Sequence, residues 1–518
     1  MAERVAPLEL PPDEFRRLGH DLVDRIAEFL GSLRERPLTF GETPAEIRAL
    51  LGRAPLPPTG AAPAVLLPET ARLLFDHSLF NGHPRFMGYI TSSAAPLGAL
   101  ADLLAATVNP NVGGWELSPV ASEIEAQTVR WVAELVGYPV DCGGLLVSGG
   151  NMANFVCFLA GRRAMLGESA RAAGLAAERA PLRIYASAGT HTWIQKAADL
   201  FGFGTDAIRW IPTDGAQRMR ADALRQRIRE DLARGNRPIM VVGTAGTVST
   251  GAVDPLRELA EISRANGLWF HVDGAYGAPA AVLPDAPDEL HALALADSLA
   301  VDPHKWLYAP LEAGCVLVRE AHRLSEAFGY TPAYYRFETG GEEPPINYYE
   351  LGLQNSRGFR ALKVWLGLRQ AGRDGYVRMI GDDCRLAEAL HRTVAAHPEL
   401  EAATLGLSIA TFRYVPRDLR DAGAAAADYL NTLNETLLAR LKTAGELFVT
   451  NAVLDGRFLL RACIVNFRTT EADVTAIPAI VARTGRAVDA ELRPGRVIPA
   501  QFRANTPRPP SQLPTASG

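Results

Sequence analysis

The sequence lacks the features that mark secreted, membrane-spanning and nucleic-acid-binding proteins. Its 518 residues include five cysteines, an odd number without a CxxC pair, so neither a disulfide framework nor a cysteine zinc site is expected. No stretch approaches the roughly 20 uninterrupted apolar residues of a membrane helix, and the acidic, proline-containing N-terminus does not resemble a secretory signal. A net charge of −5 favours neither nucleic acid nor an anionic membrane as a partner. We therefore expect a cytoplasmic globular protein.

Common catalytic motifs are also absent. No Gly-Lys pair occurs, which excludes a P-loop, and there is no HExxH zinc motif. The stretch GTAGTVSTG is close to the GxSxG turn of serine hydrolases, but Thr247 stands where that motif has its first glycine. His271 and Asp273 have no third ligand at useful spacing, so we predict no metal site.

What the sequence does contain is a regular alternation of short apolar runs and helical patterns between about residues 144 and 319. In one of these helices Asp254 is expected to cap, Pro255 to start the first turn and Gly267 to end the helix. Such an alternation predicts a mainly parallel sheet with helices on both faces, in which ligands bind at the carboxyl ends of the strands. The seven expected strands are GLLVS, RIYASA, AIRWIP, PIMVVGT, LWFHVD, SLAVD and GCVLVR.

The regions on either side of this alternation have their own patterns. Residues 15–33 have apolar side chains at helical spacing, and a proline-rich connector at 53–63 separates this helix from the rest, which suggests that it packs on a second subunit. Two helical patterns and the strand RFLLRACIVNF follow residue 375 and indicate a smaller domain. We divide the chain into an N-terminal helical segment that packs on a dimer partner (1–85), a large α/β domain (86–375), a small C-terminal α+β domain (376–490) and a proline-rich tail (491–518).

Residues that could bind a ligand or take part in catalysis occur where the expected strands end. Lys305 lies among apolar residues in LAVDPHKWLYAP, where burial would favour its neutral, nucleophilic amine, although a lysine that extends its head into water is the more common case. Asp273 ends the strand LWFHVD and could either cap a helix or face a cationic ring nitrogen. Gly149, Gly150 and Asn151 form a strand-to-helix turn that could hold a phosphate.

His191 follows another strand and could be structural or catalytic. Together, these groups are what pyridoxal phosphate requires. A lysine holds its aldehyde as a Schiff base, a cradle anchors its phosphate, and a carboxylate keeps its pyridine nitrogen protonated so that the ring acts as an electron sink.

The motifs DPHKW, HVDGAYG, SGGNMAN and EFRRLGHDLVDRIAEFL resemble the group II pyridoxal-phosphate-dependent amino acid decarboxylases, which include aromatic L-amino acid decarboxylase and glutamate decarboxylase. The resemblance covers about residues 15–468 and implies a fold-type I PLP-dependent transferase, a homodimer, and decarboxylation of an L-amino acid to the amine and carbon dioxide. It implies that Lys305 is the Schiff-base lysine, that Asp273 pairs with the pyridine nitrogen, and that His191 stacks on the ring. The cofactor residues it implies are Gly150, Asn151, Met152, His191, Thr247, Asp273, Ala275, Asp302, His304 and Lys305.

On the substrate side, the resemblance places Tyr334, in TPAYYRFETGGEEPP, at the position of the tyrosine that returns a proton to the decarboxylated carbon. Relatives without this tyrosine tend to form an aldehyde. Tyr89, Gly113 and Arg357 are further expected substrate contacts. Tyr89 favours an aromatic substrate. Gly113, in contrast, replaces a bulky residue that helps to enclose the substrate in the aromatic enzymes of the family. In place of the family's Gly-Thr-Thr the chain has Thr247 followed by a valine, so a hydroxyl near the cofactor's phenolic oxygen is either absent or supplied by Thr247.

Other functions remain open at this point. A glutamate-type or aldehyde-forming decarboxylase, a carbon-carbon lyase, an aminotransferase and a cofactor-binding protein without turnover are all compatible with the same fold.

Overall fold

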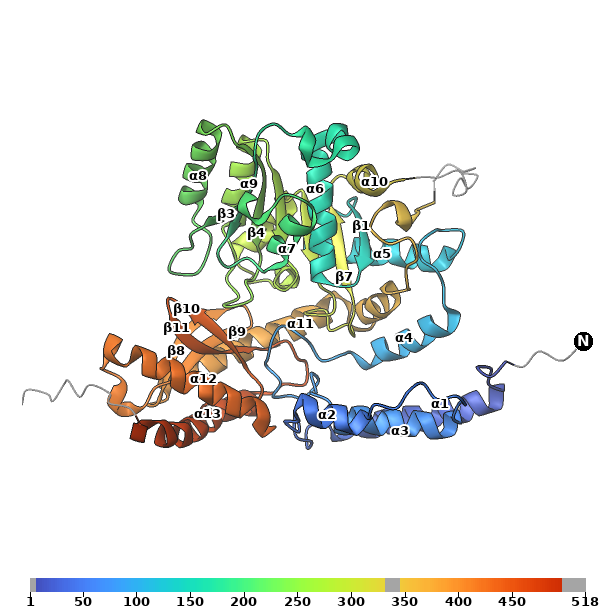
Figure 1. Cartoon of the computed structure of the whole chain (residues 1–518), viewed down its shortest axis with the longest axis vertical. Helices are drawn as coiled ribbons and strands as arrows, with labels where there is room; N and C mark the ends of the chain where they lie inside the picture. Colours follow the sequence, from blue (N-terminus) through green and yellow to red (C-terminus); the bar gives the residue numbers. More distant parts are fainter. Residues whose placement is uncertain (1–5, 331–344, 496–518) are drawn as a thin grey trace, which may run out of the picture.

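The large domain is built on one seven-stranded sheet (Figure 1). In this computed structural model, which describes residues 6–330 and 345–495, the strand order is β1-β7-β6-β5-β4-β2-β3. Strands β3, β2, β4, β5 and β6 are mutually parallel, and β7 runs antiparallel to both β6 and β1. The predicted mainly parallel sheet is therefore confirmed. Its strands are β1 (Gly143–Val147), β2 (Leu182–Ser187), β3 (Ile208–Ile211), β4 (Arg237–Thr244), β5 (Trp269–Asp273), β6 (Ser298–Val301) and β7 (Gly314–Val318).

Helices cover both faces of this sheet because the strands are apolar on both sides. Along β4, Val241 packs into one apolar cluster, while Met240 and Val242 pack into the other. The first cluster is covered by α5 (Pro119–Leu135), α8 (Ala221–Ala233) and α9 (Leu256–Ala265), and the second by α6 (Gly150–Ala173), α7 (Trp193–Leu200) and α10 (His322–Phe328).

The smaller C-terminal domain is drawn in orange and red in Figure 1. Its antiparallel sheet has the order β10-β11-β9-β8 and packs against α11, α12 and α13. Helix α11 runs through the boundary that we expected at residues 375–376, and its one non-helical residue is Gly372. The elements are α11 (Ala361–Ala396), β8 (Leu400–Gly406), β9 (Ile409–Tyr414), α12 (Ala427–Ala444), β10 (Thr450–Leu454), β11 (Arg457–Cys463) and α13 (Glu471–Leu492).

The N-terminal helices leave apolar side chains uncovered. Helices α1 and α3 lie side by side, away from the large sheet (Figure 1), and Arg34 connects this segment to the small domain through Asp473. Phe15 is 54% exposed and Leu104 is 54% exposed, although both are large apolar residues. The helices are α1 (Pro12–Ser32), α2 (Pro44–Leu51), α3 (Pro63–Asp76) and α4 (Pro96–Val108).

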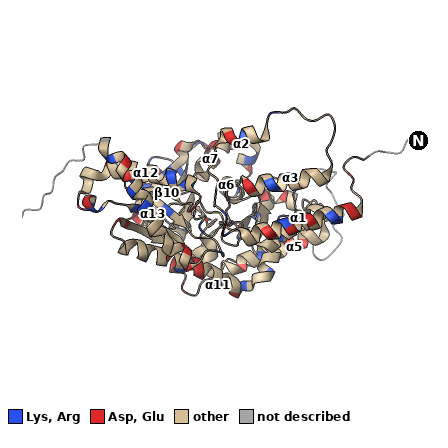
Figure 2. Ribbon diagram, turned by 90° about the horizontal axis from the view of Figure 1, so that it is seen from below, with Lys and Arg blue, Asp and Glu red and all other residues tan. Residues whose placement is uncertain are grey.

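Charges of both signs are interspersed along α1, α2 and α3 (Figure 2), in keeping with the small net charge. Within residues 6–330 and 345–495, no helix combines the length and the apolar character needed to cross a bilayer.

The predicted role of Asp254 as a helix cap is wrong. Helix α9 begins without a side-chain cap, because the Asp254 carboxylate is buried and accepts hydrogen bonds from the backbone N–H groups of Met219 (2.7 Å) and Thr244 (2.9 Å). Burial raises the pKa of Asp254 to about 6. This side chain therefore fixes the end of β4, one of the strands that build the site.

Candidate active site

The predicted site residues meet at the carboxyl ends of the parallel strands. The turns after β1, β2, β4, β5 and β6 bring their side chains around one cavity of about 200 Å³. This is the position at which ligands bind in open α/β sheets. The cavity is lined by Ile90, Gly150, Asn151, Asn154, His191, Thr244, Gly246, Val248, Asp273, Ala275, Tyr276, Asp302 and Lys305.

Lys305 lies in this cavity with its ammonium group beside a carboxylate. The turn after β6 places its Nζ 2.9 Å from Oδ2 of Asp302. Burial acts to lower the pKa of Lys305, but the negative charges of Asp302 and Asp273 outweigh that effect and raise the pKa above its ordinary value. The expectation that burial favours a neutral amine is therefore wrong for this structure, since the lysine is held as a cation by its acidic neighbours.

Asp273 ends β5 with both carboxylate oxygens engaged. Its Oδ2 accepts a hydrogen bond from the indole N–H of Trp193 at 2.8 Å, and its Oδ1 accepts one from the backbone N–H of Ala275 at 3.2 Å. The side chain is buried but lines the cavity. A carboxylate stabilised in this way can face a cationic group on the cavity side.

His191 lines the same cavity and follows β2. Its Nδ1 accepts a hydrogen bond from the backbone N–H of Trp193 at 3.3 Å, which leaves the ring proton on Nε2. Burial, assisted by the charge of Lys305, lowers the pKa of His191 against the opposing effect of Asp273. The imidazole is thus a neutral, flat group that can lie against an aromatic ring.

The turn after β1 forms a cradle at the N-terminus of α6. Gly149 has a φ of 136°, and a Cβ on Gly150 would lie 2.5 Å from Oδ2 of Asp302, so this turn needs glycine. No side chain caps α6, which leaves its first backbone N–H groups free to bind an anion such as a phosphate.

Two buried polar atoms of the cavity have no hydrogen-bond partner within the described residues. They are Oδ1 of Asp302 and Oγ1 of Thr244. Unpaired buried polar atoms are costly, so they indicate a polar ligand. With the cradle, the lysine and Asp273, these atoms provide the donors and acceptors that pyridoxal phosphate requires, so the residues fit this group.

Three predicted cofactor residues do not line the cavity. The hydroxyl of Thr247 is 2.9 Å from that of Thr250, and Thr247 is not among the lining residues, so its position does not support the expectation that it supplies a hydroxyl there. His304 lies behind the cradle, where its Nδ1 accepts the backbone N–H of Ala313. Met152 is half-buried in α6, outside the cavity lining.

The structure places the predicted substrate residues in different environments. Arg357 is buried and its guanidinium pairs with Glu125, so the prediction that it contacts substrate is not supported by its position. A Cβ on Gly113 would lie 2.1 Å from the backbone oxygen of Asn355, and this close approach explains why glycine stands there. Tyr89 is 57% exposed beside the cavity residue Ile90. Tyr334 lies outside the described residues.

The structure adds cavity residues that the sequence did not reveal. Thr244 and Val248 lie on either side of Thr247 in the chain, and Asn154 follows the predicted cradle by one helical turn. Tyr276 comes from the turn after Asp273, and its hydroxyl is 2.7 Å from that of Ser408 in the small domain. Thr244, Val248 and Tyr276 lie at or just after strand ends, which were predictable, whereas the direction of each side chain was not.

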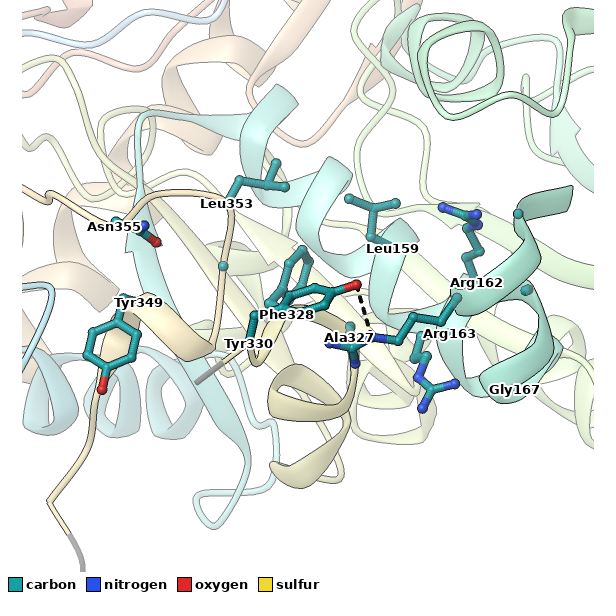
Figure 3. Close-up of a pocket in the computed structure, with 14 residues that line it drawn as sticks. Leu159, Arg162, Arg163, Gly167, Ala327, Phe328, Tyr330, Tyr349, Leu353 and Asn355 are labelled. Atoms are coloured by element: carbon teal, nitrogen blue, oxygen red, sulfur yellow. Dashed lines mark hydrogen bonds between the residues drawn. The ribbon is translucent and has the colours of Figure 1, made fainter. Parts of the chain in front are cut away.

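A larger cavity of about 870 Å³ lies elsewhere, between α6 and α10 (Figure 3). Arg171 borders it and donates a hydrogen bond to the hydroxyl of Tyr330 at 3.1 Å. Among the described residues that line it, none is a predicted site residue. Its size alone does not make it the site, because it lacks the converging lysine, carboxylate and glycine cradle.

Comparisons with known proteins identify the family of the chain. The pyridoxal-dependent decarboxylase conserved domain matches residues 64–415. The chain is 33% identical over 471 residues to an aromatic-L-amino-acid decarboxylase of Bacillus atrophaeus, covering 91% of this chain and 95% of that one. It is 29% identical over 466 residues to a phenylacetaldehyde synthase of Petunia hybrida, covering 88% and 91%.

A solved structure is similar over nearly the whole fold. Oryza sativa TDC, crystallised with PLP and tryptamine, superposes with a TM-score of 0.85 at 27% identity, covering 93% of this chain and 99% of that one. The cavity chemistry, the fold and these similarities lead to one conclusion: the chain belongs to the pyridoxal-dependent decarboxylase family and is a pyridoxal-phosphate-dependent amino acid carboxy-lyase.

Proposed function

We propose that this enzyme decarboxylates an aromatic L-amino acid to the corresponding amine. The main support for this class of substrate is the set of residues that line the cavity. Its described lining contains apolar Ile90 and Val248, and Lys305 is the one lysine or arginine among the lining residues. Since Lys305 is committed to the cofactor in this proposal, no second cation of the described lining is available to bind a side-chain carboxylate. This disfavours glutamate and aspartate as substrates.

The relatives support the same class. The Bacillus atrophaeus protein is named for aromatic L-amino acids, and the rice protein was crystallised with tryptamine, an amine with an indole ring. On this chain, Tyr89 precedes the lining residue Ile90, and its ring centroid lies 6.2 Å from that of Phe448. Aromatic side chains near the cavity would favour an aromatic substrate.

We assign the roles of the site residues as follows. Pyridoxal phosphate, when bound, supplies the electron sink for the pair released as carbon dioxide leaves. Lys305 would hold the cofactor through its amine, and the free N–H groups of the Gly150 turn would bind its phosphate. Asp273 would pair with its ring nitrogen, and the neutral imidazole of His191 would lie against its ring. Asp302 would hold Lys305 in place through its 2.9 Å contact.

The proton that replaces carbon dioxide would come from Tyr334. The breaking of the carbon-carbon bond leaves an electron pair that must take up a proton at the same carbon for the amine to form. An aldehyde product would instead require oxygen and release of ammonia. The similarity to a phenylacetaldehyde synthase makes this second outcome worth testing directly.

The proposal is tested by the products formed with single amino acids. Phenylalanine, tyrosine, tryptophan, dopa, histidine, glutamate and aspartate are supplied one at a time to the cofactor-loaded enzyme, with carbon dioxide, amine, aldehyde and oxygen consumption measured together. We expect equal amounts of carbon dioxide and amine from an aromatic substrate. Turnover of glutamate or aspartate in preference to the aromatic amino acids would overturn the substrate class.

The role of Tyr334 is tested by the variant Tyr334→Phe. We expect it to lower amine formation and to increase oxygen consumption and aldehyde. The adjacent Tyr335 provides a matched control, because Tyr335→Phe removes the same hydroxyl one residue away. Unchanged amine formation in Tyr334→Phe would contradict the assignment.

We further propose that the enzyme is a homodimer in the cytoplasm. The exposed apolar residues of α1, α3 and α4 support a second copy as the covering partner, since monomeric proteins rarely leave such patches open. The free state of all five cysteines supports a reducing compartment.

Two chain changes test the dimer. A truncation that starts after Pro37, or a charge placed on the exposed face by Val23→Glu, should lower the mass measured by light scattering from that of a dimer to that of a monomer. A truncated chain that stays dimeric and active would contradict a role for α1 in the interface. The variant Asp24→Lys serves as the control, because it changes a charge at an exposed position outside the apolar face and should leave the dimer intact.

A further inference from the structure

Trp193 contacts both residues that would bind the cofactor ring. It is fully buried at the first position of α7. Its side-chain N–H donates to Asp273 at 2.8 Å, while its backbone N–H donates to Nδ1 of His191 at 3.3 Å. One residue therefore connects two site residues that lie 82 positions apart in the chain.

The indole is itself held in a fixed orientation. Its ring centroid lies 5.4 Å from that of His271 in an edge-to-face arrangement, and Phe158 packs against it at 6.3 Å. His271 cannot turn freely, because its two ring nitrogens lie 2.8 Å from the hydroxyl of Ser298 and 2.8 Å from the side-chain oxygen of Asn154. Asn154 in turn donates to the backbone oxygen of Gly150. This network extends from the cradle to Asp273.

We propose that Trp193 is a positioning residue that orients Asp273 and His191 for the cofactor ring. Its N–H donates to Oδ2 of Asp273, and the other oxygen, Oδ1, accepts from the backbone N–H of Ala275, so that the carboxylate is held in one orientation. Its backbone N–H selects the His191 tautomer with the proton on Nε2. The inference rests on the proposed role of Asp273 as the partner of the ring nitrogen.

The test is a double-mutant cycle on cofactor affinity. Apoprotein is titrated with pyridoxal phosphate for the wild type, Trp193→Phe, Asp273→Asn and the double variant, and the visible spectrum is recorded against pH. Loss of a hydrogen bond to a buried charge should weaken binding by about 10- to 100-fold in Trp193→Phe. In the Asp273→Asn background the same change should weaken binding by less than about threefold, because the charge that it serves is gone.

A matched control comes from Trp365, whose indole N–H donates to Gln127 at 2.7 Å away from the cavity. Trp365→Phe should leave cofactor affinity and spectrum unchanged. If Trp193→Phe does not fold, as judged by circular dichroism, β-(3-benzothienyl)alanine at position 193 keeps the shape and replaces the N–H with sulfur. The same loss of affinity is expected from it.

The outcomes separate this inference from the proposed function. If Asp273→Asn alone binds the cofactor as the wild type does, the assigned role of Asp273 fails. If Asp273→Asn weakens binding while Trp193→Phe does not, or if Trp193→Phe has an equal effect in both backgrounds, the role of Asp273 stands and the positioning role of Trp193 is overturned.

Discussion

Replacement of Arg357 distinguishes a structural role from the substrate contact that the sequence suggested. Its guanidinium forms a two-point contact with the carboxylate of Glu125 and donates to the backbone oxygens of Val112 (2.8 Å) and Leu146 (2.6 Å). Glu125 also accepts the backbone N–H of Leu146 at 2.8 Å. Both side chains are buried, with 4% of Arg357 and 0% of Glu125 exposed. The pair therefore ties α5 and the 346–358 segment to the end of β1.

The magnitude follows from the burial of the pair. Removal of one member of a buried ion pair costs about 3–5 kcal/mol, because the other charge is left uncompensated. For a large domain this corresponds to a fall in the unfolding temperature on the order of 10 °C. We expect this fall in Arg357→Met. The double variant Arg357→Met, Glu125→Leu should lose less than the sum of the two single variants, since no unpaired charge remains.

The assay is thermal unfolding at fixed protein and cofactor concentrations, because both affect the transition. The exposed Arg373 provides the control, and Arg373→Met should change stability by no more than about 0.5 kcal/mol. KM is measured on the folded fraction at 25 °C and should stay within about twofold of wild type, since a residue that does not touch substrate removes no substrate binding. A variant with wild-type stability and a large rise in KM would refute the structural role.

Three further predictions concern the site and its support. Burial raises the pKa of Asp383 to about 7, above the value of 3.8 for an exposed carboxyl, so the folded state binds this proton more tightly. The free energy of unfolding should therefore fall as pH rises from about 4 to about 7, by up to about 1.4 kcal/mol per pH unit, and Asp383→Asn should remove this slope in urea titrations at several pH values. Gly150→Ala should weaken cofactor binding by tenfold or more in apoprotein titrations, because its Cβ would lie 2.5 Å from Asp302; full affinity would contradict the cradle. Thr244→Val should weaken cofactor binding more than Thr247→Val, since the hydroxyl of Thr244 is unpaired in the cavity and that of Thr247 is bonded to Thr250; the reverse order would restore Thr247 to the site.

The sequence predicted the sheet, and the edge of the sheet at which the site lies, because both depend on local patterns. Apolar runs bounded by turns located the seven strands of the large sheet, and the residues after the parallel strands fell at the same edge, whereas β7 runs the opposite way. Lys305, Asp273 and the Gly149–Gly150 turn were found in this way. Strand ends in a parallel sheet converge whatever the details of packing.

The sequence could not predict which side chains turn toward the cavity, or what pairs with a charge from a distant segment. The pairing of Arg357 with Glu125 could not be predicted because the two residues lie 232 positions apart. Asp254 was taken for a cap because its acceptor role depends on amides from two other segments. The charge of Lys305 depends on the balance between burial and Asp302, and only the structure provides the distance that decides it.

The central claim is that Lys305 holds the cofactor, and the scarcity of lysine makes this directly measurable. The chain has four lysines, Lys196, Lys305, Lys363 and Lys442, and Lys305 is the one that lines the cavity. The measurement is reduction of the cofactor-loaded protein with borohydride, followed by mass spectrometry of its peptides. We expect a single pyridoxyl adduct on the peptide that contains Lys305, and no such adduct in the Lys305→Ala variant. An adduct on another lysine, or none on a protein that binds the cofactor, would contradict it.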